Sequence, residues 1–208
     1  MTTSGHNANI ITSMTNDEFA NAIAQRMSGK LTNDTASAAT LKIDRIETPV
    51  GLMFAIADEN HLHALSYMDM DSQKMTTMLQ TLCVATGHAL ALGTNSITNQ
   101  VKAELDAWFV GDSRSFTVPL MFHATPFTQK VWQALINIPF AQLRSYRDIA
   151  HEVGSPKAVR AVGQANGANP FPIIVPCHRV VATGGALGGY SGGLWRKKQL
   201  LAVEQRFG

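Results

Sequence analysis

Hydrophobic and polar positions in the first half of the chain follow strand-like patterns. Three stretches show this, at residues 41–46, 52–57 and 61–67, with the turn sequence Thr48-Pro49-Val50-Gly51 between the first two. Short apolar runs bounded by Pro and Gly are typical of strands joined by tight turns. The pattern therefore predicts antiparallel strands linked as hairpins.

Helical spacing follows the strands. Four apolar residues three or four positions apart precede Gly111: Ile97, Val101, Leu105 and Trp108. This spacing predicts a helix that ends before the glycine. Residues 41–120 are therefore expected to form a small N-terminal α/β domain with an antiparallel sheet plus helices. Residues 1–40 are rich in Ser, Thr, Asn and Ala and are interpreted as a flexible extension, with one helical spacing over residues 17–27.

Caps and prolines mark three helices in the second half of the chain. Their expected starts are Thr125-Pro126, the capping-box pattern Ser145-x-x-Asp148, and Ser155-Pro156. The last helix is expected over residues 157–165. Because the second and third helices are short and joined by a tight connection, they resemble a helix-turn-helix. Residues 121–208 are expected to form a mainly helical domain.

Charge is unevenly distributed along the chain. The formal net charge of +2 combines −4 over residues 1–139 with +6 over residues 140–208. A basic excess favours an anionic partner, although on charge alone a solvated surface is the simpler explanation. The third helix also combines Arg160 with small residues, which suit either approach to a groove or tight helix packing; they are Ala158, Ala161 and Gly163.

Composition excludes several classes of protein. A chain of 208 residues that is 45% hydrophobic and 15% charged can bury a core and is neither disordered nor collagen-like. Without a long apolar run or a signal-peptide pattern, it is expected to be soluble and cytoplasmic. Cys83 and Cys177 lie far apart and suit neither a disulfide nor a Cys-rich zinc site. His61 and His63 are interpreted as strand-surface residues rather than metal ligands.

The strongest chemical signal is a Cys-His pair that ends an apolar, proline-flanked run at residues 169–178. A cysteine nucleophile needs thiolate character from a base or a positive field. Adjacent strand residues point to opposite faces, so His178 would act on Cys177 through a water or after a turn at the cysteine. The residues alone favour a nucleophile only modestly over a buried structural thiol.

The block Pro176-Cys177-His178-Arg179-Val180 resembles the O6-alkylguanine-DNA alkyltransferases, also called methylated-DNA-protein-cysteine methyltransferases. Further matching motifs flank it: Arg160-Ala161-Val162-Gly163, Asn169-Pro170, Gly189-Tyr190-Ser191-Gly192-Gly193-Leu194 and Leu200-Leu201-Ala202-x-Glu204. The resemblance covers about residues 127–204. It implies a ribonuclease H-like N-terminal domain and a winged-helix-like DNA-binding domain.

The same resemblance implies a DNA repair activity. An alkyl group would pass irreversibly from O6-alkylguanine in double-stranded DNA to Cys177, in a single-turnover suicide reaction that follows base flipping through the minor groove. No cofactor and no metal are implied, and the protein is expected to act as a monomer in the cytoplasm, on the nucleoid, or in the nucleus of a eukaryotic source. Activity on O4-alkylthymine is left open.

Residue roles follow from the resemblance. His178 would take the thiol proton through a water, Glu204 would orient it, and Tyr146 would protonate guanine N3. Asn169 would hold the turn that carries the cysteine. Expected substrate contacts are Tyr146, Pro172, Cys177, Val180, Tyr190 and Ser191, although Pro172 and Tyr190 are equally compatible with a core position. Expected DNA contacts are Tyr146, Arg147, Ser155, Ala158, Arg160, Ala161, Gly163, Thr183 and Thr128, with Arg160 filling the gap left by the flipped base.

Two other classes of function remain open from the sequence. A non-catalytic lesion sensor would need no cysteine, so Cys177 speaks against it. A Cys-His hydrolase would turn over an ester or amide repeatedly and without DNA.

Overall fold

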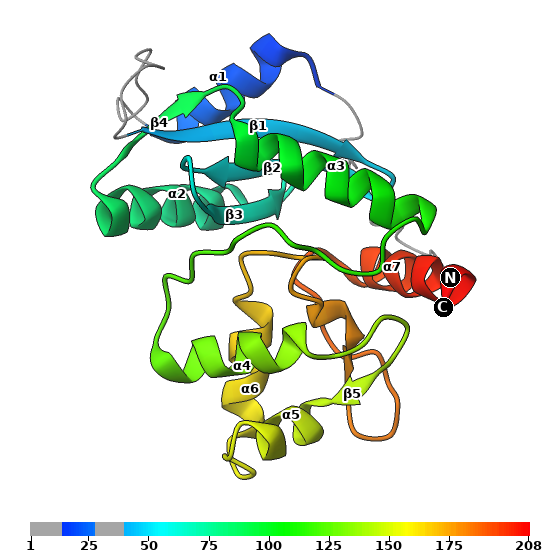
Figure 1. Ribbon diagram of the computed structural model, residues 1–208. Helices are drawn as coiled ribbons and strands as arrows, with labels where there is room; N and C mark the ends of the chain where they lie inside the picture. Colours follow the sequence, from blue (N-terminus) through cyan, green and yellow to red (C-terminus); the bar gives the residue numbers. More distant parts are fainter. Residues whose placement is uncertain (1–13, 28–39) are drawn as a thin grey trace, which may run out of the picture.

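The computed structural model describes residues 14–27 and 40–208 as two packed units (Figure 1). We call residues 40–110 the sheet unit and residues 126–207 the helical unit; residues 111–125 link them. A four-stranded sheet with helices forms the first, and short helices dominate the second. The mixed α/β fold class predicted from the sequence is confirmed.

The sheet consists of β1 (Thr40–Thr48), β2 (Gly51–Ala57), β3 (Leu62–Tyr67) and β4 (Ala89–Leu92), in the order β3-β2-β1-β4. The first three pair antiparallel, as predicted, and Gly51 ends the first turn with a φ of 110°, a conformation that favours glycine. The sequence pattern did not predict β4, which pairs parallel with β1, or the helix α2 (Ser72–Thr86) before it.

Both faces of the sheet are covered. Alternate residues of β2 pack on opposite sides, so all seven are buried. Helix α2 and helix α1 (Asn16–Met27) cover one face, while α3 (Ser96–Val110) and the helical unit cover the other. Helix α3 ends at Gly111 as predicted.

Helix α1 confirms the helical spacing over residues 17–27 and corrects the expectation that this part of the chain is a flexible extension. Phe19 and Ile23 are 4% and 0% exposed in the core against the sheet, and Arg45 of β1 donates a hydrogen bond of 2.8 Å to Asn16. The apolar face of this helix thus packs into the core of the sheet unit. The rest of the proposed extension, residues 1–13 and 28–39, lies outside the described residues.

The helical unit contains α4 (Pro126–Ile136), α5 (Tyr146–Glu152), α6 (Val159–Gly167) and α7 (Leu194–Phe207), with a 3-10 turn η1 (Cys177–Arg179) and two short paired strands, β5 (Arg144–Ser145) and β6 (Val180–Val181). Thr125 caps α4, and Ser145 and Asp148 form the predicted capping box of α5. The predicted cap at Ser155 is wrong. Instead, the carbonyl of Ser155 accepts a hydrogen bond from the N–H of Ala158 in a backbone turn, so α6 begins only at Val159.

The edge strand β3 joins the two units. Its Leu65 N–H donates to the carbonyl of Pro170, and the linker pairs with Leu62 through Pro119 and Met121. This pairing covers the hydrogen-bonding edge that an outer strand would otherwise expose. No helix among the described residues is long and apolar enough to cross a membrane.

The histidine of β3 also contacts the linker. His63 is 4% exposed, and its ring shares hydrogen bonds of 2.9 Å with Asp58 and 2.8 Å with His123. The interpretation of His63 as a strand-surface residue is therefore wrong, because the linker covers it.

Candidate active site

Asn169 closes the loop that delivers Cys177. Its side-chain amide donates to the carbonyl of Val175 at 2.8 Å, and its Oδ1 accepts from the N–H of Phe171 at 2.9 Å. Within this loop Ile173 has a φ of 75°, a strained conformation for a β-branched residue. Such strain persists only where surrounding contacts enforce it, and Asn169 supplies two of them.

Cys177 lies at the start of the turn η1 and is 2% exposed. Burial raises the pKa of its thiol to about 11, although the Asn169 side chain and the charge of Lys197 act in the opposite direction. At neutral pH the resting sulfur is therefore a protonated thiol. A nucleophilic role requires a base that takes this proton during the reaction.

His178 is placed to be that base. It is fully buried, and its Nε2 lies 2.9 Å from Oε1 of Glu204, as the resemblance implied. An ionised carboxylate only accepts, so Nε2 carries the hydrogen and Nδ1 carries the lone pair. No described residue hydrogen-bonds that Nδ1. Burial lowers the pKa of His178 despite the neighbouring carboxylate, which keeps the imidazole neutral and able to accept a proton.

Arg179 completes this cluster, and the sequence reasoning gave it no role. Its Nε and a terminal nitrogen donate to Oε1 of Glu204 at 2.9 and 2.7 Å, and its other terminal nitrogen donates to the carbonyl of Ile138 at 2.6 Å. Burial alone would raise the pKa of Glu204, but hydrogen bonds from His178 and Arg179 outweigh it and lower that pKa. The sequence signal that could have identified Arg179 was its position directly after His178, in the same tight turn.

A cavity of about 170 Å³ opens beside the sulfur. It is lined by Cys177, Tyr146, Tyr190, Ser191, Gly163, Asn166, Gly167 and Gly189. Burial raises the pKa of Tyr146, so its hydroxyl remains a hydrogen-bond donor. Four of the six predicted substrate contacts therefore meet at one cavity.

The other two predicted contacts lie elsewhere. Val180 does not line this cavity, and its carbonyl accepts a 2.5 Å hydrogen bond from the buried Lys197. Pro172 lines an adjoining groove of about 710 Å³ between the two units, which shares Gly167 and Ser191 with the cavity. Neither side chain forms part of the cavity wall next to the sulfur.

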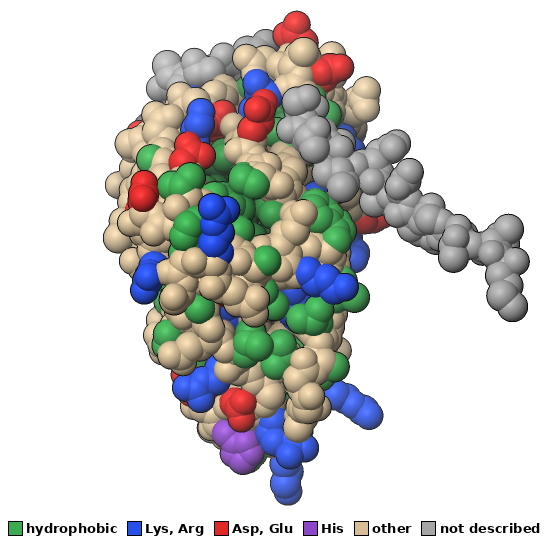
Figure 2. Space-filling model, turned by 90° about the vertical axis from the view of Figure 1, so that its right-hand side faces the viewer, with side chains coloured by type: hydrophobic (Ala, Val, Ile, Leu, Met, Phe, Trp, Pro, Cys, Tyr) green, Lys and Arg blue, Asp and Glu red, His purple; other side chains and the backbone are tan. Residues whose placement is uncertain are grey.

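Seven of the nine predicted DNA contacts lie on α5, on α6 or in the connection between them, whereas Thr128 lies on α4 and Thr183 follows β6. Arg147, Arg160 and Thr183 are exposed, and a Cβ added to Gly163 would meet nothing within 4 Å. The remaining ones are half-buried: Thr128, Tyr146, Ser155, Ala158 and Ala161. Figure 2 shows basic side chains projecting from the lower part of the molecule.

Part of the basic excess is internal. Arg179, Arg196 and Lys197 are 5%, 3% and 0% exposed. These three charges bind carboxylates and carbonyls inside the protein. The charge count of the second half therefore overstates the positive surface that faces solvent.

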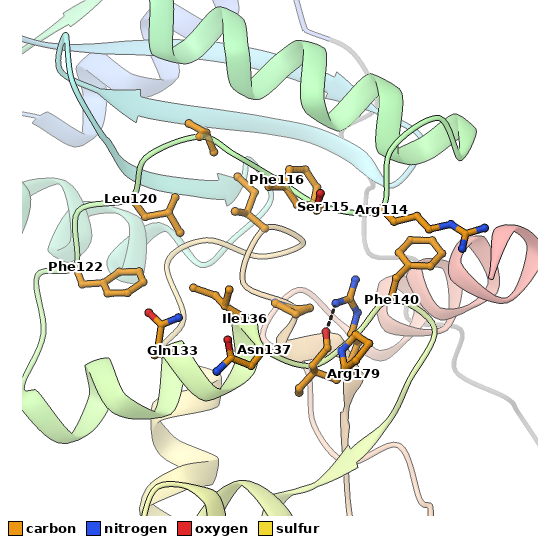
Figure 3. Close-up of a pocket in the computed structure, with 15 residues that line it drawn as sticks. Arg114, Ser115, Phe116, Leu120, Phe122, Gln133, Ile136, Asn137, Phe140 and Arg179 are labelled. Carbon is orange, nitrogen blue, oxygen red and sulfur yellow. Dashed lines mark hydrogen bonds between the residues drawn. The ribbon is translucent and has the colours of Figure 1, made fainter.

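A larger cavity of about 470 Å³ lies between the linker and the end of α4 (Figure 3). Phe116, Phe140 and Arg114 line it, and Arg179 reaches its edge, where the dashed line marks the bond to Ile138. Cys177 does not line this cavity. The smaller cavity beside the sulfur is therefore the candidate site.

Comparisons with known proteins match this arrangement. Residues 126–206 match the family described as 6-O-methylguanine DNA methyltransferase, DNA binding domain. The constitutive methylated-DNA–protein-cysteine methyltransferase of Bacillus subtilis is 54% identical over 107 residues, which are 51% of this chain and 65% of that protein. A probable methylated-DNA–protein-cysteine methyltransferase of Acanthamoeba polyphaga mimivirus is 40% identical over 80% of this chain and 98% of its own length. The match thus covers just under two thirds of the Bacillus protein and nearly all of the viral one.

Solved structures are similar over both units. A crystal structure of Mycobacterium tuberculosis OGT in complex with DNA has a TM-score of 0.69 and 35% identity, and covers 80% of this chain and 94% of that one. An O6-methylguanine-DNA methyltransferase from Pyrococcus kodakaraensis has a TM-score of 0.57 and 27% identity, over 79% of this chain and 98% of that one. Coverage of this extent includes the sheet unit as well as the helical unit.

Proposed function

The chain belongs to the 6-O-methylguanine DNA methyltransferase family, and on that premise we propose that it repairs DNA by taking the alkyl group of O6-alkylguanine onto Cys177. The observation that carries the proposal is the sulfur at a small cavity, followed in the chain by a histidine that Glu204 orients. A thioether has no route back to the thiol at this site. Each protein molecule therefore reacts once.

The described side chains account for each proton in this reaction. Nδ1 of His178 takes the thiol proton through a water, and Glu204 stabilises the imidazolium that forms. The sulfur then attacks the alkyl carbon, a C–S bond forms and the C–O6 bond breaks. Tyr146, which lines the cavity, donates its hydroxyl proton to guanine N3, so the base leaves as a neutral molecule. The proton held by His178 then passes to the Tyr146 phenolate, which leaves both side chains neutral. No cofactor takes part.

Access to the cavity requires base flipping, because O6 of a stacked guanine cannot reach a buried sulfur. Arg160 is exposed on α6 and is proposed to fill the vacated space from the minor groove. The small residues of α6 allow the helix to approach closely. The proposed backbone contacts are Tyr146, Arg147, Ser155, Thr183 and Thr128.

The domain division is part of the same proposal. The sheet unit with the linker corresponds to a ribonuclease H-like domain at residues 41–120, to which the structure adds α1. Residues 121–208 correspond to a winged-helix-like DNA-binding domain in which α5 and α6 form the helix-turn-helix. A monomer that works in the cytoplasm on double-stranded DNA completes this picture.

Stoichiometry tests the proposal directly. The protein is mixed with an excess of duplex that carries one O6-methylguanine, and the peptide with Cys177 is weighed by mass spectrometry. We expect one added methyl per protein and an equal amount of restored guanine, with no uptake by Cys177→Ser. Product in excess of protein would indicate a hydrolase, and an unmodified peptide with intact lesion would refute alkyl transfer.

A further inference from the structure

Tyr67, at the end of β3, reaches from the sheet unit to the wall of the candidate cavity. Its side chain is 4% exposed, and its hydroxyl lies 3.2 Å from the hydroxyl of Tyr190. Tyr190 lines the cavity beside Cys177. Burial raises the pKa of both phenols, so both stay neutral and one donates to the other. One wall of the cavity is thus held from the other unit.

Arg196 fixes the ring of Tyr67 in this position. Its guanidinium carbon lies 4.1 Å from the ring centroid, in cation-π geometry. The same guanidinium donates to the carbonyl of Val50 at 2.7 Å and to Asp69 at 2.8 Å, both in the sheet unit. Because Arg196 is 3% exposed and bonded on both sides, Tyr67 has little freedom to swing away.

The loop after Tyr190 packs directly on the same ring. A Cβ added to Gly192 would lie 2.5 Å from a ring carbon of Tyr67 and 2.8 Å from one of Tyr190. Arg196 also donates to the carbonyl of Gly192 at 2.9 Å. Only glycine allows this close approach. The rings of Tyr67 and Tyr190 therefore pack closely on the backbone of Gly192.

We propose that Tyr67 is a positioning residue that holds Tyr190 against the cavity and thereby limits the size of the alkyl group that Cys177 accepts. The inference rests on the proposed function. A methyl group adds little volume beside the sulfur. A larger group in the same cavity pushes the Tyr190 ring outward, and this displacement breaks its contact with Tyr67 and compresses Gly192 against both rings.

Single-turnover rates with two substrates test this role. Tyr67→Phe keeps the ring and its contact with Arg196 but removes the hydroxyl contact. We expect the ratio of the benzyl to the methyl transfer rate, measured with O6-benzylguanine and O6-methylguanine in the same duplex, to rise about fivefold, as the loss of one net hydrogen bond predicts. Tyr190→Phe removes the same contact from the other side and should raise the ratio similarly. The double variant should add nothing further.

Ser66→Ala is the matched control. It removes a hydroxyl from the preceding position of β3, where the Ser66 hydroxyl donates to the sulfur of Met70 within the sheet unit, and the ratio should stay at the wild-type value. An unchanged ratio in Tyr67→Phe, an equal fall of both rates, or independent effects in the double variant would overturn the role of Tyr67. If Tyr67→Phe unfolds, Tyr190→Phe decides the question alone. Wild-type protein that accepts neither group would instead refute the proposed function.

Discussion

The two units bury different kinds of side chain. Of the described buried Lys, Arg and Glu residues, the sheet unit holds Lys42, and the helical unit holds Arg179, Arg196, Lys197 and Glu204. The sheet unit is otherwise stabilised mainly by apolar residues on both faces of β2. The helical unit places charges in its interior, where each needs a partner to offset the loss of hydration. This loss of hydration occurs near the Cys177 sulfur, where the reaction requires a base, His178, and the carboxylate that orients it, Glu204.

The largest expected effect compares one interior residue from each unit. Phe54→Ala leaves a cavity in the sheet unit, and Glu204→Gln leaves Arg179 and His178 without their anion. Each should lower the free energy of unfolding by about 3–5 kcal/mol in urea denaturation. Only Glu204→Gln should also slow alkyl transfer, by about 100-fold or more, at a temperature where both variants are folded. An equal loss of rate in folded Phe54→Ala would break the distinction.

The next effect concerns pH. The folded pKa of Cys177 is about 11, above the roughly 8.5 of an unfolded cysteine. Between these values the unfolded chain loses the proton first, so stability is full below about pH 8.5 and falls as pH rises toward 11. Wild-type protein should lose about 2–3 kcal/mol more than Cys177→Ala over this interval. Parallel curves for wild type and Cys177→Ala would contradict the raised pKa.

The surfaces of the two units differ in their expected role in DNA binding. Arg160→Ala should slow transfer from duplex DNA at least about tenfold but leave transfer from free O6-benzylguanine within about twofold, because only the duplex requires base flipping. Lys102→Ala removes the same charge from an exposed site on α3 of the sheet unit and should leave both rates unchanged. Equal losses with the two substrates would show that Arg160 does not assist flipping.

The smallest effect compares two helix caps. Asn95 and Ser145 each form a capping box, at the start of α3 and α5. Replacement of either by Ala should lower the free energy of unfolding by about 1 kcal/mol. Since Tyr146 follows Ser145 directly and lines the cavity, Ser145→Ala should also slow transfer a few-fold, whereas Asn95→Ala should not. Similar kinetics in the two variants would mean that α5 positions Tyr146 without its cap.

Several local elements could be predicted because their signals lie within a few residues. The hairpin strands, the end of α3 at Gly111 and the box at Ser145 all follow from spacing and cap chemistry. Strand β4 was missed because four residues carry too little pattern to identify it. The cap at Ser155 was wrong because a turn and a helix start share the Ser-Pro signature.

Contacts across long stretches of chain could not be predicted in the same way. The sequence motif pointed to Glu204 as the partner of His178, 26 residues away, but not to Arg179 on the same carboxylate. It also left Arg196 and Lys197 within a surface charge count, although both are buried. Burial depends on which segments pack over a residue, and no local periodicity reports that.

The amino-acid sequence by itself determined the local elements and the identity of the reactive groups, because caps, spacings and the Cys-His block each act within a few residues. Only the tertiary structure decided that burial raises the pKa of the thiol, that three basic side chains of the helical unit are internal, and that Tyr67 meets Tyr190 across 123 positions of chain. The physical reason is that pKa values, desolvation and the positions of the side chains that line the cavity all depend on neighbours in space. These neighbours come from both units and exist only once the edge strand β3 and the cysteine loop have packed together.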